Sequence, residues 1–79
     1  MKLEIRTPAS EMYAGEVSLV QLPGIDGLFE ILEHHAPLVA ALQKGQVKIE
    51  TKEDKQTQTF DINGGVVEVL HDKILVLAE

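Results

Sequence analysis

The sequence contains no cysteine and no tryptophan, and its aromatic side chains are limited to Tyr13, Phe29 and Phe60. The absence of cysteine excludes a disulfide framework and a thiolate zinc site, so aliphatic side chains must build the core. Proteins that read single-stranded nucleic acid stack bases on aromatic rings, and this chain offers little surface for that purpose. A domain of 79 residues also buries only about 60% of the surface that its unfolded chain exposes. The chain is therefore expected to form one small domain, residues 1–79, of modest stability.

Basic residues are few as well, because seven lysines and arginines stand against thirteen acidic residues, for a formal net charge of -6. This charge repels phosphate backbones and anionic lipid headgroups, and no cluster of basic residues interrupts it. The longest apolar runs, 38–42 and 74–78, are far shorter than the roughly 20 residues that span a bilayer. Residues 1–6 alternate polar and apolar side chains, unlike a signal peptide. We expect no nucleic-acid partner, no direct membrane insertion, and a protein that stays in the compartment where it is made.

Alternation of apolar and polar side chains is the main structural signal that is present. A period of two places one face of a strand on a core and the other in water. Expected strands cover 2–6, 12–15, 16–22, 28–32, 38–42, 46–51, 57–62, 66–70 and 74–78, with turns at 7–10, 23–27, 33–37, 63–65 and 71–73. Short strands with frequent turns predict an all-β protein, an antiparallel β-sandwich or barrel.

Two of these segments have patterns other than simple alternation. Residues 38–42 also fit a helical stripe, but Pro37 before them and Gly45 after them leave room for barely two turns of helix, which favours a strand. The run 74–78 is apolar throughout, which is typical of a strand buried on both faces.

The densest group of polar side chains comprises Asp26, Glu30, Glu33, His34 and His35, and carboxylates with histidines can ligate zinc or iron. On a strand, Glu30 and Glu33 point to opposite faces and the adjacent histidines diverge, so a solvated loop is the simpler interpretation. No serine lies in a nucleophile elbow, and the glycines lack the strand-to-helix context of a phosphate-binding loop. We therefore expect a non-catalytic protein without cofactor or metal.

What remains is a binding surface along residues 23–38, where two turn regions flank a short apolar run. Loops on rigid scaffolds commonly carry recognition, although the same spacing also fits a long hairpin connection. Two rival functions stay open at this point. One is a free-standing β-sandwich adaptor that grips a peptide or small molecule in a concave apolar pocket. The other is a small metal-dependent enzyme built on Asp26, Glu33, His34 and His35.

Three segments resemble the epsilon subunit of F-type ATP synthases. Residues 24–38 are similar to the family signature Gly-x-Phe-Gly-Ile-Leu-Pro-Gly-His-Ala-Pro-Leu. Residues 12–17 are similar to its early aromatic-x-Gly-x-Val segment, and residues 63–69 to its Gly-Gly-x-x-Glu-Val. The three segments occur in the family's order and span most of the chain.

The resemblance implies a sandwich of two sheets with about ten short strands, at the foot of the central stalk, on the cytoplasmic face of the bacterial inner membrane. It implies two partners, the gamma subunit and the c-ring, and a role in coupling them during proton- or ion-driven ATP synthesis. By position, Thr7, His35, Ala36 and Pro37 would face the gamma subunit, whereas Asp26, Gly27 and Leu28 would face the c-ring.

The sequence departs from the family's usual pattern at several positions. Leu28 replaces an acidic or polar residue, and Glu30, Glu33 and His34 replace glycine, proline and glycine. The sequence also stops at Glu79, before the inhibitory helical hairpin of longer relatives. The resemblance then implies a subunit that couples rotation without that inhibition.

Overall fold

The computed structural model describes residues 1–79 and contains eight β-strands and no helix. The strands are β1 (Lys2–Arg6), β2 (Glu11–Gly24), β3 (Gly27–Leu32), β4 (Leu38–Leu42), β5 (Gly45–Thr51), β6 (Thr57–Ile62), β7 (Gly65–Leu70) and β8 (Lys73–Ala78). The all-β prediction is confirmed, and the hairpin of β5 and β6 agrees closely with the alternation in the sequence. Residues 38–42 form a strand, as the flanking Pro37 and Gly45 indicated.

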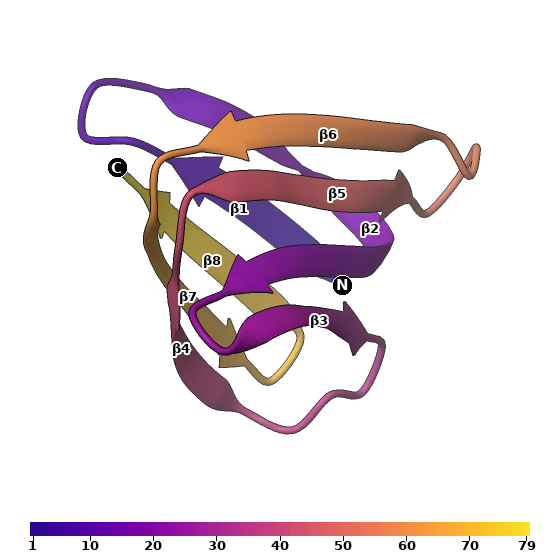
Figure 1. The fold of residues 1–79 in the computed structure, drawn as a ribbon. Helices are drawn as coiled ribbons and strands as arrows, with labels where there is room; N and C mark the ends of the chain where they lie inside the picture. Colours follow the sequence, from indigo (N-terminus) through magenta and orange to yellow (C-terminus); the bar gives the residue numbers. More distant parts are fainter.

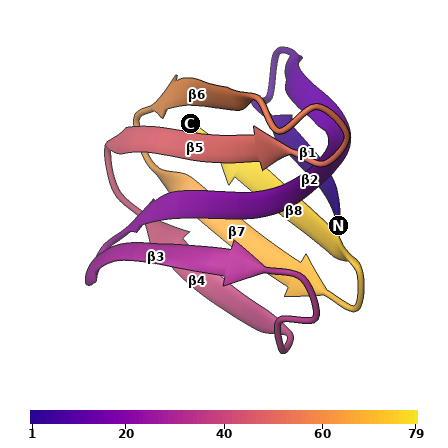
Figure 2. The same cartoon turned by 90° about the vertical axis from the view of Figure 1, so that its right-hand side faces the viewer.

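The strands lie in two layers (Figure 1). One layer runs β6, β5, β2 and β3, and the other runs β4, β7, β8 and β1. Figure 2 shows the same two layers from the side, with their strands crossing at an angle. A twisted pair of sheets packed face to face is the arrangement expected of a β-sandwich.

Strand β2 belongs to both layers, because its first half pairs with β1 and its second half with β3 and β5. The register against β5 shifts between Val17 and Leu19, so Ser18 is the extra residue of a bulge. Its hydroxyl donates to the Glu50 carboxylate at 2.9 Å. Bulges bend and twist a strand, and here the bend carries the chain from one layer to the other. The two separate pieces predicted for 12–15 and 16–22 are thus one strand of 14 residues.

The sandwich is antiparallel, as expected, in every pairing except one. Strands β1 and β8 run parallel, with Leu3 opposite Ile74 and Ile5 opposite Val76. Parallel neighbours need a long connection between them, and almost the whole chain separates these two strands. Local alternation cannot reveal such a pairing, since it reports the face of a strand and not its direction.

The core consists of side chains from the inner faces of both layers, and no polar or charged residue is buried. It contains Met1, Leu3, Ile5, Val17, Val20, Leu22, Ile31, Leu42, Val47, Ile49, Ile62, Val67, Val69, Ile74, Val76 and Ala78. Strand β8 contributes only every second residue, and Leu77 is 52% exposed. The expectation that residues 74–78 are buried on both faces was therefore wrong, because the outer face of their layer is not covered.

The turn predicted for residues 23–27 is shorter than expected. Pro23 and Gly24 lie in β2, and only Ile25 and Asp26 form the turn to β3. Proline has no backbone N–H, but the Pro23 carbonyl still accepts a hydrogen bond from the Gln43 backbone N–H at 2.8 Å. Pro23 can therefore lie in the strand. The tip of this hairpin is therefore tightly held.

The connections gather at two ends of the sandwich. Met1, the loop 33–37 and the turns at 52–56 and 71–72 lie at one end, which we call the amino-terminal end (Figure 1). The turns at 7–10, 25–26, 43–44 and 63–64 lie at the other, which we call the hairpin end. The six residues of β3 join the two ends and span about 20 Å.

Candidate partner-binding surfaces

The loop 33–37 follows β3 at the amino-terminal end and makes a sharp change of direction. His34 has a φ of 66°, in the left-handed region that ordinary residues seldom occupy. The resemblance implies glycine at this position, and glycine is the residue that adopts this region most readily. The His35 Nδ1 donates to the Ala36 carbonyl at 2.7 Å, which orients the ring at the start of the Ala36-Pro37 segment.

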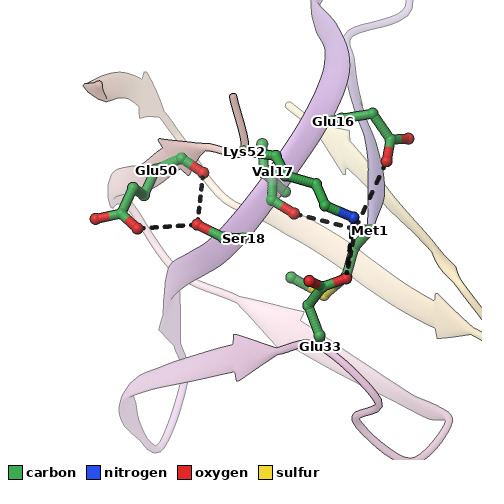
Figure 3. Close-up of polar contacts among 7 residues, drawn as sticks. All are labelled: Met1, Glu16, Val17, Ser18, Glu33, Glu50 and Lys52. Carbon is green, nitrogen blue, oxygen red and sulfur yellow. Dashed lines mark hydrogen bonds and ion pairs between the residues drawn. The ribbon is translucent and has the colours of Figure 1, made fainter. Parts of the chain in front are cut away.

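Glu33 anchors the entry to this loop (Figure 3). Its Oε1 accepts from the α-ammonium group of Met1 at 3.2 Å and lies 3.7 Å from the Lys52 Nζ. The hydrogen bond and charge of the ammonium group, followed by the charge of Lys52, lower the pKa of the Glu33 carboxyl below its ordinary value. Glu33 thus connects β3, the amino terminus and the turn after β5 at one point.

The loop borders a surface hollow of about 540 Å³ that also includes His71 and Asp72. All three histidines of the chain line this hollow. Nothing in the residue pattern groups His71 with the others, since it lies 36 residues beyond His35 in the chain. The register of β4 against β7, with Leu38 opposite Val69, brings the two segments together.

The segment Asp26-Gly27-Leu28 forms the tip of the β2–β3 hairpin at the hairpin end. Leu28 is 68% exposed and Ile25 is 61% exposed, although both are large apolar side chains. The tip and strand β4 line a groove of about 580 Å³, whose wall is mostly apolar. The amide of Gln43 donates to the Gly24 carbonyl at 2.8 Å and holds the tip against the next turn. This surface is apolar, exposed and rigidly supported.

Thr7 does not lie beside the other residues predicted to face the gamma subunit. It opens the turn between β1 and β2, where its hydroxyl accepts from the Ser10 backbone N–H at 3.1 Å. The loop 33–37 is tied instead to Met1, at the opposite end of β1, and the five residues of β1 span about 17 Å. A partner that touches both Thr7 and His35 must therefore run along the side of the sandwich.

The structure does not bring together the four side chains proposed for a metal-dependent enzyme. Asp26 is at the hairpin end, whereas Glu33, His34 and His35 are at the amino-terminal end of the same strand. No group of three or more histidine, aspartate or glutamate side chains is arranged to hold a metal ion. Asp26 is therefore too far from the other three side chains to share one site with them.

The two other motifs of the resemblance serve the fold. Gly15 leaves room for the ring of Tyr13, whose hydroxyl would lie 2.7 Å from a Cβ at that position. The ring can then pack against Phe60, with ring centroids 5.5 Å apart. Gly65 has a φ of 145°, and a Cβ there would collide with the Leu77 carbonyl of β8. These motifs position side chains and strands and do not form a site.

No helix in the structure has the length and apolar character needed to cross a bilayer. Residues 1–79 match the family described as ATP synthase, Delta/Epsilon chain, beta-sandwich domain. The ATP synthase epsilon chain of Chlorobium limicola is 46% identical over 78 residues, which cover 99% of this chain and 88% of that protein. The epsilon chain of Sulfurimonas denitrificans is 47% identical over 79 residues, but this chain spans only 60% of its length.

Solved structures agree on the fold. A chain in the cryo-EM structure of the Euglena gracilis mitochondrial ATP synthase superposes with a TM-score of 0.85 and 18% identity, over 96% of this chain and 48% of that one. A chain in the central stalk and c-ring structure of the Tetrahymena thermophila mitochondrial ATP synthase gives 0.74 and 24%, over 98% and 63%. The family model matches the full length of the chain, and the Chlorobium protein is 46% identical to it. These two findings establish the family. This chain belongs to the β-sandwich domain family of ATP synthase delta and epsilon chains.

Proposed function

We propose that the chain is a non-catalytic central-stalk subunit that couples the gamma subunit to the c-ring during ion-driven ATP synthesis. The observation that carries the proposal is the position of two surfaces at opposite ends of β3, the loop 33–37 and the hairpin tip 25–28. A subunit that relays rotation needs two separate contacts on one stiff body. Family membership supports the same role, since the relatives are ATP synthase epsilon chains.

The sandwich suits this role mechanically. Both surfaces are joined by strands that share one core of 16 buried residues. Cross-strand hydrogen bonds and close packing resist shear, so a force applied at one end is transmitted to the other. The net charge of -6 favours partners with basic surfaces, because complementary potentials guide association.

The contact assignments follow from the two ends. His35, Ala36 and Pro37 would meet the gamma subunit, and Asp26, Gly27 and Leu28 would meet the c-ring. Leu28 and the apolar groove beside it make the second contact more hydrophobic than an acidic or polar residue would. Thr7 belongs to the gamma contact only if that subunit lies along β1. The complex as a whole would sit at the cytoplasmic face of the bacterial inner membrane.

Cysteine cross-linking can test these assignments, because the chain has no cysteine of its own. In the assembled ATP synthase, His35→Cys should cross-link to the gamma subunit and Leu28→Cys to a c subunit. Gln58→Cys, exposed on the edge strand β6 away from both surfaces, is the matched control and should give neither product. Thr7→Cys decides whether the gamma subunit runs along the sandwich. Absence of this chain from active, coupled enzyme purified from native membranes would refute the proposal.

The groove at the hairpin end gives a second candidate a specific observation in its favour. A concave apolar surface beside residues 25–28 is what an adaptor protein would use to grip an apolar segment. The two functions differ in where the chain is found. A coupling subunit copurifies with the ATP synthase in constant proportion, whereas an adaptor would be recovered with other proteins when the enzyme is removed.

A further inference from the structure

Strand β3 has one edge that no other strand covers. It pairs with β2 alone, and no pairing joins it to β4 of the other layer. The strands β3 and β4 nevertheless lie side by side in both views (Figure 1 and Figure 2). An unpaired edge presents a row of backbone N–H and C=O groups to which another strand can bond.

The register shows which residues form this free edge. The Pro23 carbonyl accepts a hydrogen bond from the Gln43 N–H, so it points away from β3. Leu28 lies opposite Pro23, and two opposite residues of an antiparallel pair either bond to each other or both point outward. The backbone groups of Leu28 therefore point away from β2, and those of Glu30 and Leu32 follow at the period of two.

Strand β4 leaves part of its edge free on the same side. The Ala41 carbonyl accepts from the Ile25 N–H at 3.2 Å, so its backbone groups point toward the hairpin tip. The backbone groups of Val39, two residues earlier, point the same way and have no strand beside them. Both strands line the apolar groove of about 580 Å³. A strand edge thus borders this groove on either side.

The side chains along these edges lack the features that usually protect an edge strand. Natural sheets place lysine or proline on exposed edges to prevent unwanted pairing. Neither β3 nor β4 contains either residue, and Leu28, Leu32 and Val39 are all more than half exposed. Strand β6, at the opposite edge of the layer that contains β3, carries mostly polar side chains. The contrast favours a partner strand on the edge of β3.

A charged side chain lies at the centre of this free edge. Glu30 stands between Leu28 and Leu32 on the outer face of β3, where its carboxylate accepts from the Gln21 amide at 3.3 Å. Opposite charges on neighbouring strands attract, and like charges directly opposite each other repel. A second copy of this chain, paired antiparallel about Glu30, would bring two carboxylates together. A different partner, with lysine or arginine opposite Glu30, fits the edge better.

We propose that the free edge of β3 binds an extended segment of another protein as an added strand. The segment bonds to the backbone groups of Leu28, Glu30 and Leu32, places a basic side chain opposite Glu30, and lays alternate apolar side chains in the groove beside β4. Strand addition of this kind draws affinity from main-chain hydrogen bonds and specificity from side chains at alternate positions. The inference goes beyond the proposed function, because it holds for a coupling subunit and for an adaptor alike.

A synthetic peptide with this pattern tests the proposal on the folded chain. In Lys-Val-Thr-Val-Lys-Val-Thr-Val-Lys the central lysine shares one face with the threonines, and the valines form the other face. At saturation the peptide should slow amide hydrogen exchange of Leu28, Glu30 and Leu32 at least about tenfold, because these N–H groups gain a partner. The amides of Phe29 and Ile31, which point toward β2, should change less.

An exchange of charges provides the matched control. The peptide Lys-Val-Thr-Val-Glu-Val-Thr-Val-Lys should bind the native chain several-fold more weakly, since two carboxylates then face each other. Glu30→Lys should reverse this order of affinity, and Glu30→Gln should remove most of the difference. Glu30 is exposed, so both variants leave the core unchanged. Because the net charge of -6 attracts both peptides, the reversal is the decisive result, and its absence would overturn the proposed recognition.

Two results from the exchange experiment would also overturn the proposal. One is exchange at Leu28, Glu30 and Leu32 that saturating peptide leaves unchanged. The other is protection of these amides that appears without peptide as the concentration of the chain rises, because it would assign the edge to a second copy.

Cross-linking in cells identifies the natural segment. A photoreactive amino acid in place of Leu32 should link to another protein at a segment where a basic residue alternates with apolar ones, as mapped by mass spectrometry. The same amino acid in place of Gln58, on the edge of β6, should not give this product. Links only to this chain, or only to segments without that pattern, would refute the proposal. Peptide binding by the isolated chain does not depend on copurification with the ATP synthase, so failure of either hypothesis is recognised separately.

Discussion

His34 holds a backbone conformation that its own side chain opposes. A residue with a Cβ at a φ of 66° is strained by about 1–2 kcal/mol relative to the right-handed region. This strain energy is modest, but it lies in the loop 33–37, which we assign to the contact with the gamma subunit. The resemblance implies glycine at this position, and the positive φ of His34 gives the physical reason.

Substitutions at His34 should reveal the strain directly. His34→Val is expected to lower the free energy of unfolding by about 1–2 kcal/mol, because β-branched residues fit the left-handed region worst. His34→Gly should keep it within about 1 kcal/mol of the native value, since relief of strain and the added freedom of the unfolded chain oppose each other. Denaturant unfolding measures both. His35→Val, next to it without positive φ, is the control and should cost less than His34→Val.

The lowered pKa of Glu33 makes the stability of the fold depend on pH. The folded state holds the pKa of this carboxyl below its ordinary value of about 4.3. Its contribution to stability is therefore complete above that value and is lost as the pH falls through the folded pKa. The difference in unfolding free energy between the native chain and Glu33→Gln should be largest near neutral pH and shrink below about pH 4.

The control for this experiment is Glu53→Gln, which removes the same charge from the turn after β5, where no ion pair is made. Its difference from the native chain should change little over the same pH range. A Glu33→Gln difference that is independent of pH would show that the ion pair with Met1 and Lys52 does not contribute to folding.

At the scale of elements, the turns and one bent strand set the arrangement of the layers. The bulge at Ser18 lets β2 pair with β1 and then with β3 and β5. At the hairpin end, the turn at 63–64 delivers β7 to the centre of its layer, and Gly65 allows it to pass close to the Leu77 carbonyl. The bulge and the turn both act through the backbone. Side-chain alternation therefore predicts where the strands are but not how they are connected and bent.

Substitutions at two glycines with positive φ distinguish the cost of backbone strain from the cost of a steric collision. Gly65→Ala should lower the free energy of unfolding by at least about 2 kcal/mol, because the strained backbone and the contact with Leu77 add together. Gly27→Ala meets no neighbouring atom at a φ of 125° and should cost only about 1–2 kcal/mol. Thermal and denaturant unfolding compare the two. Equal losses would mean that the approach of β7 to β8 is not tight.

At the scale of the whole molecule, a small core must hold two working surfaces in a fixed relation. A domain of 79 residues has a free energy of unfolding of about 4–12 kcal/mol in all. A coupling body with so little reserve depends on every well-packed side chain. Its function is then sensitive to core changes that lie far from either surface.

Ile49→Ala tests this dependence. Ile49 is fully buried between the layers, and its truncation should cost about 2–5 kcal/mol, enough to populate the unfolded chain. In the assembled enzyme, the variant should reduce coupled ATP synthesis together with the amount of bound subunit. Leu77→Ala, on the exposed outer face of β8, should change stability by less than about 1 kcal/mol and leave both measurements unchanged.

The class of fold and the family follow from the residue pattern alone. Alternation in a short chain without cysteine leaves a β-sheet with an aliphatic core as the way to bury its apolar side chains, and three motifs in order were specific enough to mark the epsilon-like family. Alternation and motifs depend on residues that are close together in the chain, so short stretches of sequence are enough to recognise them.

Which distant segments meet could be learned only from the three-dimensional arrangement of the strands. The parallel pairing of β1 with β8, the separation of Thr7 from the loop 33–37, and the approach of His71 to His35 depend on strand order and register. The contact between the Met1 amine and Glu33 depends on them too. Strands pair through backbone N–H and C=O groups, which nearly every residue has. The side chains of a strand therefore do not identify the strand that will pair with it.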